Sequence, residues 1–399
     1  MPEREPSLHL RTEPFQRFGT AGAEHFWDRH SEREAVERIV REGGIGFVEG
    51  PRRVGKTSLA LLLKDQLEQE ADFRVGYLNL TTVTTANLPD RLLTAVTELA
   101  HRQRVVRLSD RLHTLIGWFR VQPEVVGTFD NSGNPKVELR FQEYRQRDEA
   151  AIYEDIVKLL LQAPDHAGGP VALILDEFQE VLSLAPLLPA LLKAGFSGGR
   201  RVAIVLMGSQ ESLMARIAHS PRAPLYRIGP TVRIGALPRD VVRQEIATRF
   251  GWSSITVGED VADHIYDACD GIAQDIQTVC AALLDRCRTS TWWKVGFDEL
   301  SEVMTEVIEE VSARFDGTWA DCSPIQRELL MAVAVHGGTG VTGQAFLEKM
   351  NPHLRRTSAA VISAAKALRA RDIIEATAPG RYRLKDPFFA MYLRQISSG

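Results

Sequence analysis

Apolar and polar positions follow two different periods along the first 210 residues of the chain. Short apolar runs with the length of buried strands occupy residues 45–48, 73–80, 171–175 and 201–207. Segments with helical periodicity occupy residues 31–40, 58–67, 88–102, 148–162 and 183–194. Strands that alternate with helices in this order predict an α/β fold, in which helices cover both faces of a parallel sheet.

Residues 105–147 interrupt this alternation. Residues 119–129 and 137–141 alternate apolar and polar side chains on either side of Asn131-Ser132-Gly133-Asn134. This pattern is typical of a β-hairpin. We therefore expect an insertion on the sheet domain that contains a hairpin, and the pattern indicates no function for it.

The remainder of the chain is mostly helical and ends in a different module. Four amphipathic segments predict a helical domain, at residues 240–250, 260–269, 272–287 and 297–315. From Ser323 onward, three helical segments and a short hairpin around Pro379-Gly380 follow the order of a winged helix. The predicted domains are a loosely ordered lead-in at 1–24, a sheet domain at 25–236, a helical lid domain at 237–318 and a winged-helix domain at 319–399.

Composition places the chain among ordinary soluble proteins. The 399 residues are 44% hydrophobic and 25% charged. No apolar run approaches the roughly 18 residues that cross a bilayer, and the charged start lacks the apolar core of a signal peptide. The four cysteines form no CxxC pair, which disfavours a disulfide framework or a zinc site. We expect a cytoplasmic protein without membrane contact.

Charge is unevenly distributed along the chain. The whole chain has a formal net charge of −4, whereas residues 321–399 hold 11 Lys and Arg against 6 Asp and Glu. The C-terminal fifth therefore carries +5 and the rest carries −9. This distribution excludes the molecule as a whole from polyanion binding and leaves that role open for the C-terminal module.

Residues 50–57 fit the phosphate-binding pattern GxxxxGK[ST] at every position. Gly50 and Gly55 permit loop conformations that turn backbone N–H groups toward a phosphate. Lys56 would reach the β- and γ-phosphates of ATP, and the Thr57 hydroxyl would bind Mg²⁺. A strand before the loop and a helix after it provide the context that this chemistry requires. The predicted nucleotide contacts of this P-loop are Gly50, Pro51, Arg52, Arg53, Val54, Gly55, Lys56, Thr57 and Ser58.

The side chains of Arg52 and Arg53 are expected to face the lid or solvent, so that only their backbone contributes.

A second candidate element is the apolar strand 171–175, which continues into Asp176-Glu177. Ligands bind at the carboxyl edge of open parallel sheets, where these carboxylates are expected. Asp176 would hold Mg²⁺ through water, and Glu177 would polarise the attacking water as a general base. The alternative is a strand that merely ends in solvated acids.

The following strand ends in Gly208-Ser209-Gln210. A serine at the end of the strand beside the acidic one could sense the γ-phosphate or orient the attacking water. Ser209 is also a suitable helix N-cap. The sequence leaves both roles open.

Together these motifs resemble those of the archaeal-type ATPases of the STAND class, a branch of the AAA+ and ASCE P-loop NTPases. The P-loop of that group commonly reads GPRRxGKTSL, which residues 50–59 match. Its DExQ and FxxRxxE motifs correspond to residues 176–179 and 26–32, and its C-terminal Tyr…Asp-Pro-Phe signature to residues 382–389. The resemblance spans most of residues 25–395. It implies a P-loop NTPase core followed by a helical lid and a winged helix.

The same group carries a PLYGR-like segment, matched here by Pro224-Leu225-Tyr226-Arg227 without the glycine. The resemblance implies a phosphate-sensing role for Arg227, and a surface arginine after a turn is the alternative. In the lid, residues 271–277 have Ala273 where relatives usually have proline. This segment also lacks the sensor arginine of origin-recognition initiators, which disfavours such an initiator.

In a winged helix that reads DNA, the third helix enters the major groove. Basic residues on this helix and the wing would neutralise phosphates. The candidates are Arg355, Arg356, Lys366, Arg381 and Arg383. The exposed side of the third helix offers mostly serine and alanine, so a regulatory or protein-docking module is the alternative.

The sequence thus predicts a Mg²⁺-dependent ATPase that acts as a regulatory switch. ATP would change the arrangement of the lid and the winged helix and, with it, self-association. Because the sequence contains no substrate-processing domain, the effector is expected on another chain. The alternative is a DNA-binding winged-helix protein, either a transcription regulator or a mobile-element or antiviral-defence component, with ATP as a structural or regulatory ligand. A nucleotide kinase is disfavoured because no acceptor-base lid is recognisable.

Overall fold

The computed structural model describes residues 13–70, 72–100, 116–129, 135–141, 148–196, 201–290, 292–350 and 357–398. The chain divides into two compact units. The sheet unit is Thr20–Gly235, and the helical unit joins Ala236–Gly399 to the chain up to Gly19. No helix in the described ranges combines the length and the apolar character of a membrane span.

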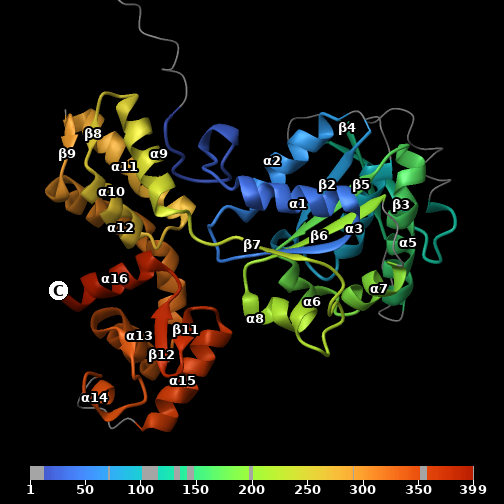
Figure 1. The fold of residues 1–399 in the computed structure, drawn as a ribbon. Coiled ribbons are helices and arrows are strands. Elements are labelled where there is room, and N and C mark those ends of the chain that lie inside the picture. The colour runs from blue at the N-terminus through green and yellow to red at the C-terminus, as the bar shows by residue number, and fades with distance from the viewer. Residues whose placement is uncertain are drawn as a thin grey trace, which may run out of the picture. The chain divides into compact units, whose positions relative to one another are not determined.

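The sheet unit is built on five parallel strands in the order β2-β5-β6-β1-β7 (Figure 1). Because every pairing is parallel, the carboxyl ends of the strands lie along one edge. The strand β6 lies between β1 and β5, so one strand separates the P-loop strand from the acidic strand. The strands are β1 (Gly44–Glu49), β2 (Arg74–Asn79), β5 (Val171–Asp176), β6 (Val202–Gly208) and β7 (Thr231–Arg233).

Helices cover both faces of this sheet. On one face, α1 (His30–Glu42) and α2 (Lys56–Glu68) share a core cluster with Ala172 and Ile174 of β5. The other face packs Val171, Leu173 and Leu175 of β5 into a larger cluster with the remaining helices. Burial on both faces explains why the strands are continuous apolar runs rather than alternating ones. The remaining helices are α3 (Leu88–Ala100), α5 (Glu149–Ala167), α6 (Val181–Leu184), α7 (Leu188–Gly195) and α8 (Glu211–Met214), followed by a π-helical turn at Ala215–His219.

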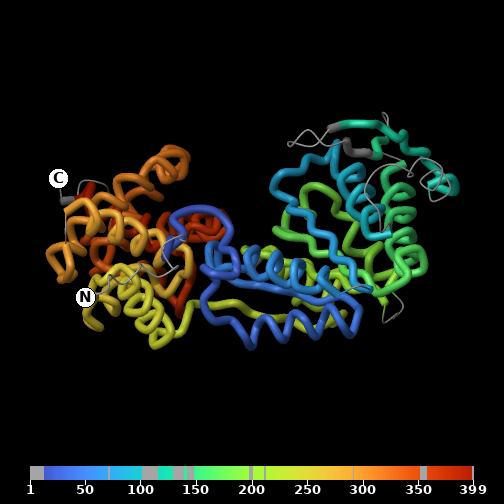
Figure 2. The backbone as a smooth tube through the Cα atoms, turned by 90° about the horizontal axis from the view of Figure 1, so that it is seen from above, coloured from blue at the N-terminus to red at the C-terminus, as the bar shows by residue number. Residues whose placement is uncertain are grey.

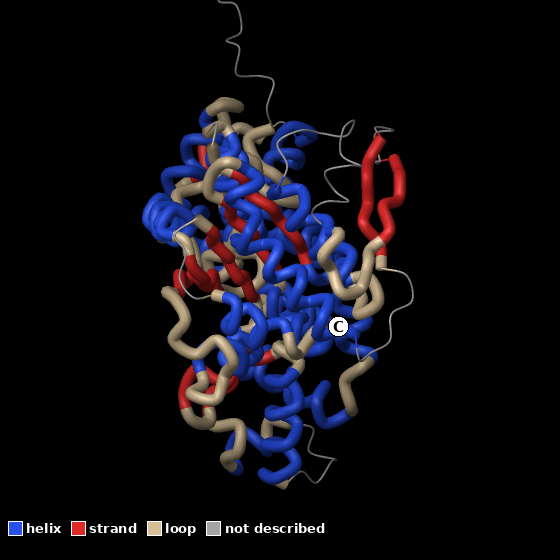
Figure 3. The backbone as a smooth tube through the Cα atoms, turned by 90° about the vertical axis from the view of Figure 1, so that its right-hand side faces the viewer, coloured by secondary structure: helices blue, strands red, loops and turns tan. Residues whose placement is uncertain are grey.

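The insertion contains an antiparallel pair, β3 (Glu124–Phe129) with β4 (Pro135–Arg140). Figures 2 and 3 show this hairpin standing out from the body of the sheet unit. Its base is anchored, because Leu139 and Phe141 are buried in the larger core cluster. The backbone N–H of Phe141 also donates to Asp90 Oδ1 on α3 at 2.8 Å.

The helical unit contains the lid and the winged helix. The longest helix, α12 (Phe297–Ala320), runs through the boundary expected at 318–319. Its Phe315 stacks on Phe389 of the last helix at 4.9 Å between ring centroids, so the winged helix packs on the end of α12. The other lid elements are α9 (Arg239–Gly251), β8 (Thr256–Val257), α10 (Glu259–Ala268), α11 (Ala273–Ser290) and β9 (Lys294–Val295).

The winged helix has a small sheet in the order β10-β12-β11, flanked by helices. Its final helix begins at Pro387, and the Asp386 side chain accepts from the N–H groups of Phe388 at 3.0 Å and Phe389 at 3.3 Å. Its elements are α13 (Pro324–His336), β10 (Gly338–Thr339), α14 (Gln344–Leu347), α15 (Ser358–Ala370), β11 (Ile374–Ala378), β12 (Arg381–Leu384) and α16 (Pro387–Ser398).

Residues 13–19, which belong to the lead-in that the sequence suggested to be loosely ordered, make specific contacts. Phe15 is only 4% exposed, and its ring lies 4.9 Å from that of Phe250 on α9. Arg17 forms ion pairs with Asp285 and Glu310. Residues 13–19 therefore pack onto the lid. An extended segment held by one aromatic anchor has no periodicity by which the sequence could reveal it.

Candidate functional site

The predicted P-loop joins the end of β1 to the start of α2. Gly55 is the N-cap of α2 with φ of 101°, a conformation that favours glycine. Arg53 is also left-handed, with φ of 67°. Left-handed positions in a loop turn backbone N–H groups toward one side, and the N-terminus of the following helix favours negative charge. The loop therefore fits a phosphate group.

The Lys56 ammonium lies against this loop. Its Nζ donates to the carbonyl oxygens of Gly50 at 3.0 Å and Pro51 at 2.7 Å, and the residue is 5% exposed. Two carbonyl groups thus hold the ammonium at the place where the loop would receive a phosphate. When a phosphate binds, Lys56 can exchange these carbonyl oxygens for phosphate oxygens. Arg52 is exposed at the same loop.

The Asp176 carboxylate is fully buried and receives two hydroxyl donors on one oxygen. Thr57 Oγ1 donates to Asp176 Oδ2 at 2.7 Å, and the Tyr77 hydroxyl donates to the same oxygen at 2.8 Å. Tyr77 comes from β2, where it pairs with Ile174 of β5. Burial and the charge of Asp176 raise the pKa of Tyr77 well above its usual range, so Tyr77 remains a donor. The sequence did not predict Tyr77 as a site residue.

Thr57 and Asp176 suit a Mg²⁺ ion, which prefers oxygen ligands and usually keeps water and substrate phosphates in its coordination sphere. Their oxygens lie 2.7 Å apart at the start of α2. Within the described ranges, no group of three or more His, Cys, Asp or Glu side chains could hold a metal. A Mg²⁺ at this position would therefore take its other ligands from the nucleotide and from water.

Glu177 and Ser209 meet across the neighbouring strand ends. Ser209 Oγ donates to Glu177 Oε2 at 2.7 Å. The Gln179 amide donates to the same carboxylate oxygen, and its Nε2 also lies 3.3 Å from Ser209 Oγ. The structure thus brings together the acidic and the serine positions that the sequence selected. The Ser209 hydroxyl thus donates to Glu177, while the choice between a phosphate-sensing role and a helix-capping role stays open.

Two further contacts tie the P-loop to flanking segments. Ser58 Oγ accepts from the backbone N–H of Ala21 at 3.0 Å. The buried Arg29 side chain donates to the carbonyl of Val54 at 3.4 Å and to that of Gly235 at 2.6 Å. Arg29 lies in the FxxRxxE motif, for which the sequence offered no structural role.

Comparison with protein families agrees with this geometry. A family described as "AAA domain" matches residues 39–217, which include the P-loop, Asp176, Glu177 and Ser209. A family described as "Probable winged helix domain" matches residues 313–395. The chain carries an AAA domain and a winged-helix domain.

Two solved structures match the fold over nearly the full length of the chain. The Walker-type ATPase PABY2304 of Pyrococcus abyssi has a TM-score of 0.60 at 16% identity, covering 96% of this chain and 99% of that chain. The ORC2 protein of Aeropyrum pernix, solved as ADPNP-ADP complexes, has a TM-score of 0.52 at 16% identity, covering 93% of this chain and 95% of that chain. Likeness at this identity shows the fold, and the predicted fold class is confirmed. No curated protein matches the chain.

Arg227 of the sheet unit lies just before the edge strand β7. It is exposed, has φ of 56° and places its guanidinium 5.2 Å from the centre of the Tyr226 ring. Two residues later, Gly229 lies against the carbonyl of Ile45, near the beginning of β1. The P-loop follows the other end of β1, roughly 16 Å further along an extended strand. The structure therefore shows no approach of Arg227 to the P-loop of its own chain.

The predicted DNA contacts that the structure describes in the winged-helix domain differ in whether their charge is already paired. Lys366 on α15 and Arg381 on β12 are exposed. Arg383 forms ion pairs with Glu375 and with Asp270 of the lid, the latter at 3.4 Å. Arg355 and Arg356 lie outside the described residues. Of the three that can be placed, one is already neutralised by acids.

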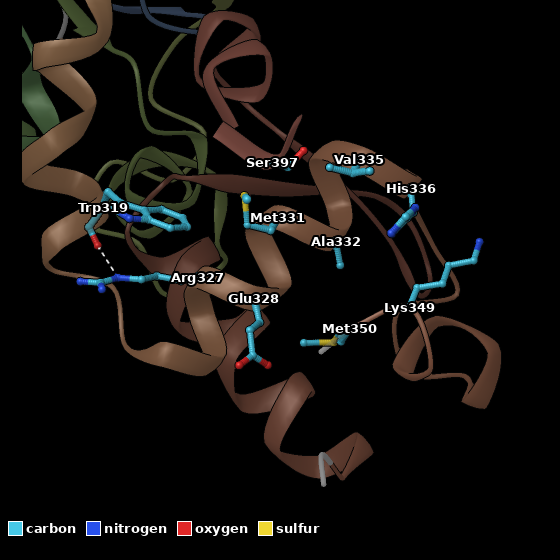
Figure 4. A pocket seen from close by; sticks show the side chains of 10 residues that line it. All are labelled: Trp319, Arg327, Glu328, Met331, Ala332, Val335, His336, Lys349, Met350 and Ser397. Carbon is cyan, nitrogen blue, oxygen red and sulfur yellow. Dashed lines mark hydrogen bonds between the residues drawn. The ribbon is translucent and has the colours of Figure 1, made fainter. Parts of the chain in front are cut away.

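A groove of about 460 Å³ lies on the winged-helix domain (Figure 4). It mixes apolar and charged side chains, and Arg327 Nε at its border donates to the carbonyl of Trp319 at 2.9 Å. Lys366, Arg381 and Arg383, the predicted DNA contacts that the structure describes, do not line it. The lining residues are Trp319, Arg327, Glu328, Met331, Ala332, Val335, His336, Lys349, Met350 and Ser397.

Proposed function

We propose that this chain is a Mg²⁺-dependent ATPase whose nucleotide state acts as a regulatory switch on the lid and the winged-helix domain. The observation that carries the proposal is the position of Glu177. Its carboxylate is held by Ser209 and Gln179 at the sheet edge where the P-loop lies, one strand away. A passive nucleotide binder has no need of an oriented carboxylate there.

Binding would use the P-loop as the structure displays it. The loop N–H groups and the N-terminus of α2 hold the β-phosphate. The Lys56 ammonium exchanges the carbonyls of Gly50 and Pro51 for phosphate oxygens. Bound Mg²⁺, held by Thr57 and Asp176, supplies charge neutralisation on the phosphates.

Hydrolysis would then rest on two side chains. Glu177 accepts a proton from the attacking water as the water oxygen bonds to the γ-phosphorus and the bond to the ADP oxygen breaks. Ser209 keeps the carboxylate oriented, and we assign to it the sensing of the γ-phosphate. Positioning and charge provide the acceleration, since phosphoryl transfer needs little covalent chemistry from the protein.

The switch is supported by the two places where the chain passes between its units. At one, Gly235 is the last residue of the sheet unit, and Arg29 ties its carbonyl to that of Val54 in the P-loop. At the other, Ala21 lies just beyond Gly19 and donates to Ser58 at the start of α2. Both connections are thus hydrogen-bonded to the nucleotide loop. A shift of the loop on ATP binding would act on both.

Limited proteolysis and small-angle scattering with Mg²⁺ and ADPNP test this switch. We expect the wild type to change its cleavage pattern and radius of gyration when ADPNP binds. Arg29→Gln should bind ADPNP within about threefold of the wild type and show a smaller change, because it breaks one connection and leaves the bond between Ala21 and Ser58 intact. Arg38→Gln, an exposed position on the same helix α1, is the matched control. A wild type that ignores ADPNP, or an Arg29→Gln variant with the full wild-type change, would overturn the switch.

The same proposal includes self-association and an effector on another chain. Arg227 is exposed beyond the beginning of β7, so we assign it to the nucleotide site of a neighbouring copy. The sequence motifs support membership of the STAND class. The complexes of A. pernix ORC2 with ADPNP and ADP lend support to adenine nucleotides as the ligand.

DNA binding by the winged-helix domain is the second candidate, with a role in transcription, mobile elements or antiviral defence. The observation that favours it is the exposed face of α15, which presents Lys366 and Arg369, with Arg381 on the wing. These charges would make non-specific phosphate contacts.

A further inference from the structure

Gln179 occupies the single 3₁₀ turn Phe178–Glu180 that follows β5, and the residue is 1% exposed. Its amide spans two strand ends. Nε2 donates to Glu177 Oε2 and lies 3.3 Å from Ser209 Oγ, while Oε1 accepts from the backbone N–H of Ser209 at 3.4 Å. Both donors and the acceptor of this buried amide are therefore used within one polar group, which makes the group rigid.

This group distinguishes the two oxygens of Glu177. The Ser209 hydroxyl and the Gln179 amide both donate to Oε2. Among the described residues, neither donor reaches Oε1. With Oε2 fixed by two donors, the carboxylate cannot rotate freely, and Oε1 is the oxygen left to accept a proton from water.

The end of β6 is shaped to admit this amide. A Cβ at Gly208 would lie 3.0 Å from Gln179 Oε1 and 2.5 Å from Met214 Cγ and Sδ. Any larger residue at this position would push the amide or the methionine away. The glycine in front of Ser209 thus fits the glutamine that follows Glu177.

We propose that Gln179 is a positioning residue for ATP hydrolysis, acting through Glu177 and Ser209 rather than on the nucleotide. The inference rests on the proposed ATPase function and deepens it. It joins Ser209 and the proposed general base Glu177 in one rigid unit. Lys56 donates to the carbonyl oxygens of Gly50 and Pro51, and Thr57 donates to Asp176. Because nucleotide binding is assigned to these groups and proton transfer to Glu177, turnover and binding should respond separately.

The test replaces Gln179 by methionine, which keeps the unbranched side chain and removes the amide. We expect kcat of Gln179→Met to fall on the order of 10²-fold, within the usual contribution of a positioned general base. The Kd for ADPNP, measured by titration, should stay within about threefold. Gln69→Met, at an exposed position after α2, is the control. Gln179→Glu keeps the shape but cannot donate when ionised, so it provides the same test should the methionine variant fail to fold.

A double-mutant cycle of Gln179→Met with Ser209→Ala tests whether the two side chains act on Glu177 as one unit. Residues that act together give a combined loss of kcat close to the larger single loss. Multiplied losses, a Gln179→Met variant with wild-type kcat, or an ADPNP affinity that falls in step with kcat would each overturn the inference. If the wild type itself turns over no more ATP than Glu177→Gln, the proposed function fails, and the wild-type assay identifies that case.

Discussion

The phosphate edge of the AAA domain and the basic surface of the winged-helix domain use charge in different ways. At the phosphate edge, Lys56 is 5% exposed and Asp176 fully buried, and each is bonded to named groups of the loop or of the neighbouring strand. Such charges are oriented before a ligand arrives, and water competes little for them. A single change there should have a large effect.

On the winged-helix domain the placed basic residues are either exposed or already paired. Lys366 and Arg381 are exposed, and Arg383 is engaged by Glu375 and Asp270. Exposed charges are screened by salt and contribute little individually. The difference teaches that the net charge of a module says less about its chemistry than the partners of each charge do.

The largest effect is expected for Lys56→Ala, which removes the buried charge of the phosphate edge. Removing a buried, hydrogen-bonded charge should weaken ADPNP binding about 10²-fold, equivalent to roughly 3 kcal/mol. Isothermal titration with and without Mg²⁺ measures it. Lys64→Ala, on the same helix but in a surface pair with Glu68, should stay within about twofold. Equal affinities for Lys56→Ala and the wild type would contradict the account.

Tyr77→Phe keeps the ring and removes the hydroxyl that donates to the Asp176 carboxylate. Partners that orient a metal ligand typically change metal affinity by about 10-fold or more. We therefore expect the Mg²⁺ concentration that half-saturates ADPNP binding to rise about 10-fold, with nucleotide affinity at saturating Mg²⁺ preserved. Tyr382→Phe in the wing serves as the control. An unchanged Mg²⁺ midpoint would show that Tyr77 only fills space.

The smallest effects are expected on the winged-helix surface. In mobility-shift assays at two salt concentrations, Lys366→Ala and Arg381→Ala should each lower the salt slope of DNA binding by about 1. Arg383→Ala should leave DNA affinity within about twofold, because its charge is already paired. A large loss of DNA affinity in Arg383→Ala would mean that Arg383 leaves Glu375 and Asp270 when DNA binds. Strong DNA binding by the wild type would favour the second candidate function.

The sequence predicted those parts of the site that depend on consecutive residues. The P-loop and the Asp176-Glu177 pair are local patterns, and their strands have the apolar character of a sheet buried on both faces. Tyr77 was missed because a tyrosine in a strand is ordinary, and only the adjacency of β2 and β5 places its hydroxyl at Asp176. Gln179 was noted as part of a motif, yet its contacts with Ser209 require β6 to lie beside β5.

Other misses have local causes. The helix α16 begins with Asp386-Pro387, a capping residue followed by a favoured first helical residue, and the sequence analysis used these residues only as a family signature. The edge strand β7 has three residues, too few to show a period. Phe15 gives no pattern at all, since its burial depends on a lid more than 200 residues away.

The most direct test of the central claim compares ATP turnover by the wild type and by Glu177→Gln, with ADPNP binding followed in parallel. The amide has the shape of the carboxylate but cannot accept the proton of water. The account predicts that Glu177→Gln binds ADPNP as the wild type does and turns over ATP at least about 10²-fold more slowly. Equal turnover by the two proteins, or no turnover by the wild type with Mg²⁺ present, would contradict it.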